Sequence, residues 1–370
     1  MSNKVIQIVS FNIPYPVNYG GVIDVFYKIV TLHQLGYEIH LHCFKYGREE
    51  SKELEKYCQK IYYYERKINI KSFFSIRPYI VQTRRSSKLI NELLKINAPI
   101  LLEGVHTCFL LEYKHLFKNK IFVRTHNIEN NYYYSLSKSK RSIKKIYFII
   151  ESLKLKRYEK RILKKADAIF SIQTGDQAFF QTINKKTYLL PLFYQEQILN
   201  IKERLKPYVL YQGDLSTPEN VDAVLWIVDS IYKKSNFKFI IAGKNPSNEF
   251  SEFISQKKIT LFKNPSEEEM NKLVKQAAIH LLYTKQNTGA KLKVLKALNS
   301  CGHVLVNSKI VAGTNLHQVC QVCETPKEFI SEIEQKLNQP LIEKEMSYRT
   351  EFLKKEYSNQ KNIQILIKKI

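Results

Sequence analysis

The feature that most constrains the fold is a recurrence of short β-branched or aromatic runs, separated by longer amphipathic stretches. This alternation is typical of a parallel sheet whose strands are joined by helices. In the first part of the chain we expect strands at 5–10, 38–44, 61–64, 100–102, 121–124, 168–172 and 188–190. The pattern therefore predicts an α/β fold with a doubly wound parallel sheet.

The alternation stops near the middle of the chain and then resumes. After Pro191 the sequence LFYQEQILNIKERLKP loses strand character, and YVLYQG after Pro207 opens a second series. Further strands are expected at 237–242, 259–262, 279–283, 304–306 and 318–322. We therefore predict a Rossmann-like domain at 1–195, a second at 206–342, and a charged helical extension at 343–370. With 44% hydrophobic residues over 370 positions, such a chain can bury two cores.

The cysteines and the apolar runs indicate a cytosolic protein. The six cysteines are scattered, which favours buried free thiols over a disulfide framework. Cys320 and Cys323 form the one close pair, and no second ligand pair follows at zinc-site spacing, so we assign no metal. No run approaches the roughly 20 apolar residues of a spanning helix, and the N-terminal sequence passes directly into a strand without a leader.

Polar and glycine-rich loops follow several of the expected strands. Ligands of open α/β sheets bind beyond the carboxyl ends of the strands. Gly20 and Gly21 open a helix after the first strand, where free backbone N–H groups favour a diphosphate. A simple tight turn is the alternative. The three-glycine dinucleotide motif and the GxxxxGK[ST] phosphate loop are both absent, which disfavours NAD and P-loop chemistry.

Two loops of the first domain carry candidate catalytic groups. The strand IFVRT runs into His126, Asn127 and Glu129, and Glu103 follows the strand at 100–102. A histidine at a strand's carboxyl end with polar neighbours is a candidate for chemistry, although most lone histidines are structural. Glu103 could help to bind an acceptor or could cap a helix.

The second domain has three comparable loops. Gly213 and Asp214 follow its first strand, and Lys244 follows its second. The segment 287–291 (NTGAK) precedes a helix and offers backbone amides, Lys291 and Lys293 to an anion. By position, this last loop is the best phosphate site.

Taken in order, these loops resemble the retaining glycosyltransferases of GT-B family 4. The matching landmarks are Gly20 and Gly21, RTHNIENNYYYS, RYEKRILKKADAIFSIQTGD, GDLSTPENVDAVLWI, IAGKNP and NTGAKLKVLKALNSCGHVLVNS, which span nearly the whole chain. The resemblance implies the GT-B fold, with two Rossmann-like domains facing a cleft that holds a nucleotide sugar. It also implies bacterial polysaccharide or lipid-linked glycan synthesis.

The resemblance further implies a division of roles. The glycine pair would touch the donor phosphate and sugar, and His126 would lie beside the reacting sugar. The donor-binding residues would be Gly20, Gly21, Gly213, Asp214, Lys244, Thr288, Gly289, Ala290, Lys291, Leu292 and Lys296. Tyr15, Glu103, Asn127 and Glu129 would lie on the acceptor side. The resemblance also implies that no metal, no cofactor and no enzymic nucleophile are needed, with the nucleotide sugar as co-substrate. The departing diphosphate would accept the proton of the acceptor hydroxyl.

One position departs from the family pattern. Family members commonly carry two glutamates eight positions apart around the last helix, and Thr288 and Lys296 occupy those positions here. A lysine cannot accept the hydrogen bond of the ribose hydroxyl. One interpretation is that donor binding has shifted and that Lys296 pairs with an additional negative charge on the donor. The other is that the chain is a degenerate GT-B protein that serves as a binding or scaffold partner of an active transferase.

Basic residues are concentrated in one segment. The chain has 59 Lys and Arg against 34 Asp and Glu, a net +25, and 132–165 alone carries twelve basic residues against Glu151 and Glu159. Ile143, Ile146, Ile150 and Leu153 recur there at helical spacing among aromatic residues. This composition suits an anionic membrane surface. A solvated helix that packs inward is the alternative, and nucleic acid is disfavoured because no binding motif accompanies the charge.

The leading functional hypothesis is therefore metal-independent hexosyl transfer from a nucleotide sugar to a glycan or lipid-linked acceptor. We expect the protein in the cytoplasm, at the inner face of the plasma membrane.

Overall fold

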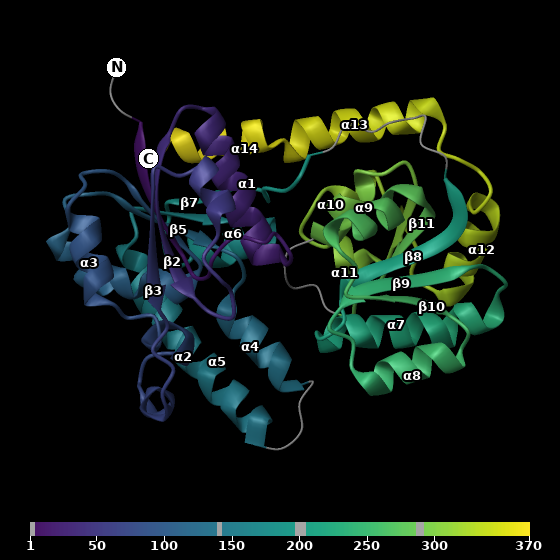
Figure 1. Cartoon of the computed structure of the whole chain (residues 1–370), viewed down its shortest axis with the longest axis horizontal. Helices are drawn as coiled ribbons and strands as arrows, with labels where there is room; N and C mark the ends of the chain where they lie inside the picture. The colour runs from purple at the N-terminus through teal and green to yellow at the C-terminus, as the bar shows by residue number, and fades with distance from the viewer. Residues whose placement is uncertain (1–3, 139–142, 197–204, 286–291) are drawn as a thin grey trace. The chain divides into compact units, whose positions relative to one another are not determined.

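The computed structural model describes residues 4–138, 143–196, 205–285 and 292–370, which divide into two compact units (Figure 1). Unit 1 comprises residues 1–194 together with Tyr357–Ile370, and most of the remaining chain forms unit 2. Each unit is an α/β domain with its own parallel sheet.

Unit 1 contains a seven-stranded sheet in the order β3-β2-β1-β4-β5-β6-β7. All neighbouring strands are parallel. The strands are β1 (Val5–Ser10), β2 (Glu38–Lys45), β3 (Lys60–Glu65), β4 (Ile100–Glu103), β5 (Ile121–Thr125), β6 (Ala168–Ser171) and β7 (Thr187–Leu189). The order reverses direction at β1 and β4, which makes the carboxyl ends of these strands the expected ligand-binding edge.

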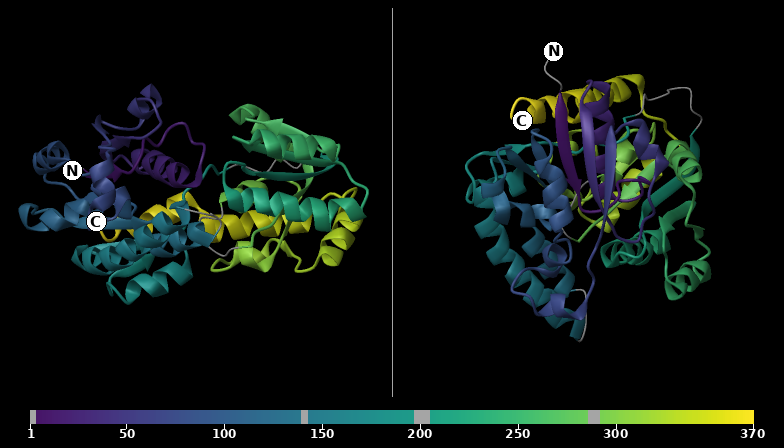
Figure 2. Two further views of the ribbon diagram at one scale, coloured as in Figure 1. Left: turned by 90° about the horizontal axis from the view of Figure 1, so that it is seen from below. Right: turned by 60° about the vertical axis from the view of Figure 1, so that its left-hand side comes forward.

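Helices cover both faces of this sheet (Figure 2). They are α1 (Gly20–Gln34), α2 (Tyr79–Gln82), α3 (Ser87–Leu94), α4 (Glu129–Lys138), α5 (Ile143–Ile162), α6 (Thr174–Gln181) and α14 (Asn359–Ile367), with 3-10 turns at Lys52–Lys56, Ile70–Phe74, Val105–Leu116 and Leu163–Lys165. Alternate strand residues face opposite layers. Leu101 and Phe122 pack in the layer of α1 and α14, whereas Leu102 and Val123 pack in the layer of α3 and α5.

Unit 2 contains a six-stranded parallel sheet in the order β10-β9-β8-β11-β12-β13. Its strands are β8 (Lys206–Asp214), β9 (Phe239–Lys244), β10 (Thr260–Lys263), β11 (Ala277–Leu282), β12 (His303–Val306) and β13 (Gln321–Val322). Its helices are α7 (Pro218–Ser230), α8 (Asn248–Gln256), α9 (Glu267–Gln276), α10 (Leu292–Leu298), α11 (Ser308–Val311), α12 (Pro326–Lys336) and α13 (Glu343–Tyr357), with 3-10 turns at Tyr232–Lys234 and Leu316–Gln318.

Local sequence signals set where several helices of unit 2 begin. Ser247 caps α8 by accepting the N–H of Phe250 at 3.1 Å. Ser266 and Glu269 cap α9 reciprocally, so that two backbone N–H groups without helical partners are both satisfied. These helices begin where a hydroxyl side chain can accept, which is the usual N-terminal signal.

The predicted architecture of two doubly wound parallel sheets is confirmed, and each of the thirteen expected strands is present within a few residues of its predicted position. The segment 343–370 is divided between the units, because α14 belongs to unit 1 and α13 lies almost wholly in unit 2. The six cysteines are free thiols, and all but the half-buried Cys320 are buried. Within the described residues, none of the helices has the length and apolarity needed to span a membrane.

Candidate active site

The amino end of α1 follows the central strand β1 in unit 1. The helix begins at Gly20, and the preceding Tyr19 provides no side-chain cap. Gly21 lies against the ring of Phe11, where a Cβ atom would sit only 2.7 Å from Cζ of that ring. A side chain at this position would have to displace the Phe11 ring, and the first backbone N–H groups of α1 have no capping side chain, which suits an anion.

The Phe11 ring brings two histidines to the same place. Its centroid lies 5.2 Å from the His106 ring and 5.4 Å from the His126 ring. His106 follows β4 and Gly104, whose φ of +72° is a conformation that favours glycine. Among the described residues Nδ1 of His106 has no hydrogen-bond partner, and burial with nearby Arg84 holds the pKa of His106 well below its usual value. His106 is therefore neutral near pH 7.

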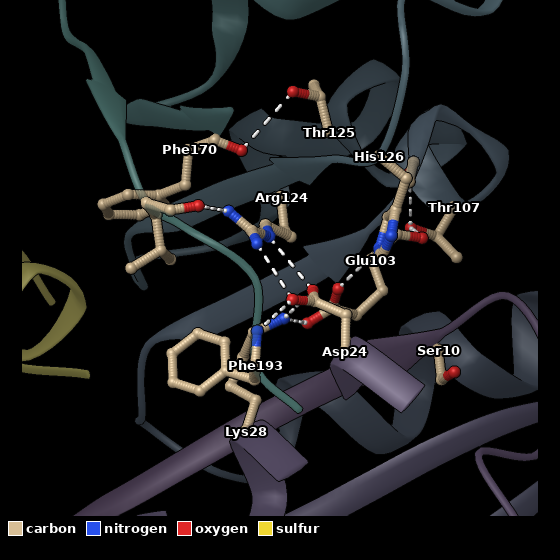
Figure 3. Close-up of polar contacts among 12 residues, drawn as sticks. Ser10, Asp24, Lys28, Glu103, Thr107, Arg124, Thr125, His126, Phe170 and Phe193 are labelled. Carbon is tan, nitrogen blue, oxygen red and sulfur yellow. Dashed lines mark hydrogen bonds and ion pairs between the residues drawn. The ribbon is translucent and has the colours of Figure 1, made fainter. Parts of the chain in front are cut away.

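His126 is the end of a buried chain of ion pairs (Figure 3). Its Nε2 atom lies 3.0 Å from Oε2 of Glu103, whose Oε1 atom accepts a hydrogen bond from Lys28 at 2.6 Å. Lys28 also donates to Asp24 at 3.1 Å, one helical turn earlier in α1. Arg124, from β5, donates twice to Asp24, at 2.9 and 3.1 Å.

This ionic chain is balanced, since two carboxylates face the basic side chains of Lys28 and Arg124. Burial alone would raise the pKa values of both carboxyl groups. Arg124 and Lys28 nevertheless hold the pKa of Asp24 far below its ordinary range. Lys28 and His126 likewise hold the pKa of Glu103 below the ordinary value of a glutamate. Both are therefore ionised near pH 7. A carboxylate only accepts hydrogen bonds, so Nε2 of His126 carries the proton that points to Glu103. The imidazole is held in one orientation.

Asp24, Glu103 and His126 could also offer ligand atoms to a metal ion, since these atoms lie within 4.8 Å of one another. Their carboxylate oxygens already accept hydrogen bonds from Lys28 and Arg124. A divalent cation there would have to displace or approach two buried positive charges, at a high electrostatic cost. The donor set therefore does not fit a metal ion, and the absence of a metal requirement stays a prediction.

The other acceptor-side candidates have structural partners. Glu129 and Asn130 donate backbone N–H groups to Glu159, at 2.9 and 3.3 Å, so Glu159 caps the start of α4. Glu129 itself is buried, and burial together with Glu159 raises its pKa to about 8. Asn127 is half-buried and hydrogen-bonded to Glu129. The half-buried Tyr15 ring packs 5.7 Å from that of Phe26.

In unit 2 the glycines adjoin the turn from β8 into α7. A Cβ atom on Gly243 would lie 2.2 Å from the carbonyl oxygen of Gly213, so the two strands approach closely at this end. Asp214 accepts hydrogen bonds from the backbone and hydroxyl of Ser216, at 2.9 and 2.7 Å. Asp214 thus holds the turn in shape.

Two lysines of unit 2 stand apart from these structural roles. Lys296, in α10, is half-buried, and no hydrogen bond to it is found among the described residues. Burial lowers the pKa of Lys296, while Glu267 raises it and Lys244 lowers it further. Lys244, at the end of β9, is therefore an electrostatic neighbour. Leu292 is buried, and Thr288, Gly289, Ala290 and Lys291 lie outside the described residues.

Sequence reasoning missed the supporting charges of unit 1. Asp24 and Lys28 lie four residues apart inside an apolar helix, and Arg124 interrupts an apolar strand. The available signal was the position of these charged residues within apolar runs, since a charge in a buried element requires a partner of opposite charge. Arg84 was also missed: it is buried, donates to the carbonyl oxygens of Phe11 at 3.0 Å and Ile80 at 2.8 Å, and has no carboxylate partner among the described residues. Burial lowers its pKa to about 9, so it remains a cation near pH 7.

Comparison with solved structures identifies the fold as GT-B. Staphylococcus aureus TarM, in complex with fondaparinux, α-GlcNAc-glycerol and UDP, is similar with a TM-score of 0.65, 10% identity and 99% of each chain covered. Anabaena HepE, in complex with UDP and glucose, has a TM-score of 0.66 at 8% identity, again over 99% of each chain. A Rickettsia africae glycosyltransferase has a TM-score of 0.62 at 15% identity, over 100% of this chain and 99% of that one.

Sequence comparison adds a further relative. An uncharacterized 44.6 kDa protein in the cps region of Klebsiella pneumoniae is 26% identical, over 84% of each chain. No family model matches the sequence.

Proposed function

We propose that this protein is a retaining glycosyltransferase that moves a sugar from a nucleotide diphosphate donor to a growing, lipid-linked glycan. The observation that carries the proposal is the fixed His126 imidazole, held by Glu103 at the carboxyl edge of the sheet beside the glycine-rich start of α1. A GT-B fold whose solved neighbours include UDP complexes supports the same class of donor. The setting we infer is the cytoplasmic face of a bacterial membrane.

The proposed reaction exchanges one bond at the sugar's anomeric carbon. The bond from that carbon to the donor diphosphate breaks, and a bond to the acceptor oxygen forms on the same face of the ring. The proton of the acceptor hydroxyl passes to the departing diphosphate. No metal is needed, because the start of α1 and the buried cation Arg84 favour the negative charge that develops.

His126 would position the sugar in this reaction. Its Nε2 atom is committed to Glu103, which leaves Nδ1 as the other polar atom of the ring. Lys28 keeps Glu103 ionised, so the hydrogen bond that orients His126 persists around neutral pH. The chain of ion pairs from Arg124 to Glu103 would thus act as a rigid support for one imidazole.

Unit 2 would bind the nucleotide through its loops at the ends of β8 and β9 and through α10. Lys296 and its neighbour Lys244 make this region positive, which suits a diphosphate or a donor with an additional negative group. Lys296 also motivates a second candidate function, because a lysine cannot accept from a ribose hydroxyl. In that case the protein is a GT-B binding partner of an active transferase.

Turnover and binding distinguish the two candidates. Thermal-shift and transfer assays with UDP, GDP, ADP and CMP sugars should show stabilisation by one nucleotide class and sugar transfer to a lipid-linked acceptor. Binding without turnover would favour the partner function, and neither binding nor turnover would reject both.

His126→Ala tests the site itself. It should lower turnover by roughly 100-fold, the usual cost of removing a group that acts in the transition state, with nucleotide affinity near that of the wild type. His115→Ala is the matched control, because His115 is an exposed histidine of the same unit. Equal turnover of the two variants would contradict the proposed role.

A further inference from the structure

A cluster of apolar side chains lies exposed on unit 1. Part of it belongs to the loop that joins β3 to α2. Ile68, Ile70, Phe74 and Ile76 have exposed fractions of 60, 77, 85 and 93%. With the less exposed Phe73, at 41%, they make five large apolar side chains within nine residues. This is unusual on a surface without a partner, and such patches commonly mark sites of association.

The loop is held in a defined shape. Its 3-10 turn (Ile70–Phe74) starts at Asn69, whose side chain accepts hydrogen bonds from the backbone and hydroxyl of Ser72, both at 2.8 Å. Phe73 stacks on Tyr79 with ring centroids 4.2 Å apart. The same turn that buries Ser72 and anchors Phe73 leaves Ile70 and Phe74 in solvent.

Helix α5 extends this apolar surface. The Phe73 ring also contacts Tyr147, with centroids 5.6 Å apart, and Lys154 donates to the Phe73 carbonyl oxygen at 2.9 Å. Both contacts place α5 directly beside the turn. The next face of the helix carries Ile146, Ile150 and Leu153, at spacings of four and three residues and with exposed fractions of 59, 47 and 56%. We call these three residues and Ile68, Ile70, Phe74 and Ile76 the apolar patch.

Only part of the basic segment 132–165 contributes to the patch. Phe148 and Tyr133 contact each other between α5 and α4, at 5.8 Å, and Ser152 donates to the Asn130 carbonyl oxygen at 2.9 Å. These side chains hold the two helices together. The apolar surface therefore depends on the loop 68–76 as much as on α5.

The exposed charged side chains of the loop 66–76 and of α5 are all basic. Exposed basic side chains flank the apolar patch on the loop and on α5, namely Lys67, Lys71, Lys145, Lys156 and Arg157. The loop contains no acidic residue, and the two carboxylates of α5, Glu151 and Glu159, are buried. The surface thus presents apolar side chains and cations together.

We propose that unit 1 docks on an anionic lipid bilayer through the apolar patch. Ile70, Phe74 and Ile76 insert at the boundary between headgroups and acyl chains, and the flanking lysines contact lipid phosphates. The nearly complete exposure of Phe74 and Ile76 describes a projecting tip, which fluid lipid can surround without a complementary surface. A second copy of the chain would face this patch with like charges, which disfavours self-association there.

Vesicle sedimentation tests the proposal without nucleotide or acceptor, so its failure would leave the proposed activity untouched. The wild-type chain should bind vesicles of equal phosphatidylglycerol and phosphatidylcholine at least tenfold more strongly than phosphatidylcholine alone. Phe74→Ser/Ile76→Ser should lower the first partition coefficient at least tenfold. Leu94→Ser/Ile342→Ser, which changes two other exposed apolar residues, should leave it within twofold.

Insertion of the loop 68–76 into the bilayer can be measured separately by tryptophan fluorescence. Trp226 is the one tryptophan, so Phe74→Trp in a Trp226→Phe background reports from the tip of the loop. Its fluorescence should shift to the blue on vesicle binding and be quenched by brominated lipid. An unshifted, unquenched tryptophan would overturn the proposal, as would equal partitioning of the wild type and the serine variant. Self-association of the wild type that the serine variant abolishes would instead show that the patch binds a second copy.

Discussion

The buried ionic chain of unit 1 predicts that Asp24→Asn is far more damaging than its size suggests. The Asp24 carboxylate accepts hydrogen bonds from Arg124, Lys28 and the backbone N–H of Phe193, the last at 2.9 Å. Asparagine keeps one oxygen but turns an NH2 group toward these donors. It also leaves Lys28 and Arg124 facing the single charge of Glu103, in a fully buried setting.

Breaking a buried ion pair from one side typically costs about 3–5 kcal/mol. This is a large share of the roughly 5–15 kcal/mol that stabilises an ordinary domain. Hydrogen exchange of peptides from β1, β4 and β5 is the suitable assay, because it reports on unit 1 alone. Since about 1.4 kcal/mol corresponds to a factor of ten, these amides should exchange about 100-fold faster or more in Asp24→Asn.

A matched control lies in unit 2. Asp229 and Lys233 form an Asp-Lys pair with the same four-residue spacing, but both side chains are about half exposed. Asp229→Asn should change local exchange by less than about threefold, as expected for an exposed pair. Adding Lys28→Met to Asp24→Asn restores the charge balance. The double variant should therefore lose less free energy of unfolding than the two single variants lose together. Strict additivity, or less than fivefold faster exchange in Asp24→Asn, would refute the reasoning.

Three further predictions concern Glu129, Gly243 and Lys296. The folded-state pKa of Glu129, about 8, exceeds the ordinary 4.5, so its stabilising contribution is complete below pH 4.5 and is lost as the pH rises through 8. Glu129→Gln should therefore reduce the fall in urea stability between pH 6 and 8 by about 1.4 kcal/mol per pH unit, and equal slopes would contradict this. Gly243→Ala should destabilise unit 2 by more than about 2 kcal/mol in Trp226 fluorescence, because the methyl group meets backbone; Gly213→Ala in the same unit, whose methyl group would meet the Asn220 side chain at 3.2 Å, should cost less. Lys296→Met should leave ligand-free unit 2 as stable or more stable in the same assay but weaken nucleotide binding at least tenfold, and the reverse pattern would refute a binding role.

The sheets were predictable because their strands are nearly continuous apolar runs. The strands Ile100–Glu103 and Ile121–Thr125 are buried on both faces. Strands of this kind are recognisable as mostly apolar runs, whatever their place in the sheet. The loops after these strands could be located for the same reason. The sequence showed that Glu103 and His126 lie at the carboxyl ends of such strands, and their hydrogen bond follows from the parallel pairing of β4 and β5.

The partners of these residues could not be predicted in the same way. Arg124 pairs with Asp24 across 100 positions, and Lys28 pairs with Glu103 across 75. No periodicity links residues at such separations. The exposed apolar residues of the loop 68–76 could not be predicted for another reason, because the sequence of a loop does not show which of its apolar side chains are buried. Phe73 is 41% exposed and stacks on Tyr79, whereas the neighbouring Phe74 is 85% exposed, and the two letters alone do not show this difference.

The position of α14 has a consequence for how the chain matures on the ribosome. Ile363 and Leu366 of this helix complete the core layer that contains Ile6 and Ile8, and Asn362 donates to the Leu192 carbonyl oxygen at 3.2 Å. Most of unit 1 is therefore translated before unit 2, whereas its helix α14 is translated after unit 2. While unit 2 is being synthesised, the apolar flank of α1 that α14 covers stays exposed to solvent. Removal of α14 would then disturb the amino-terminal unit rather than the unit next to it in sequence.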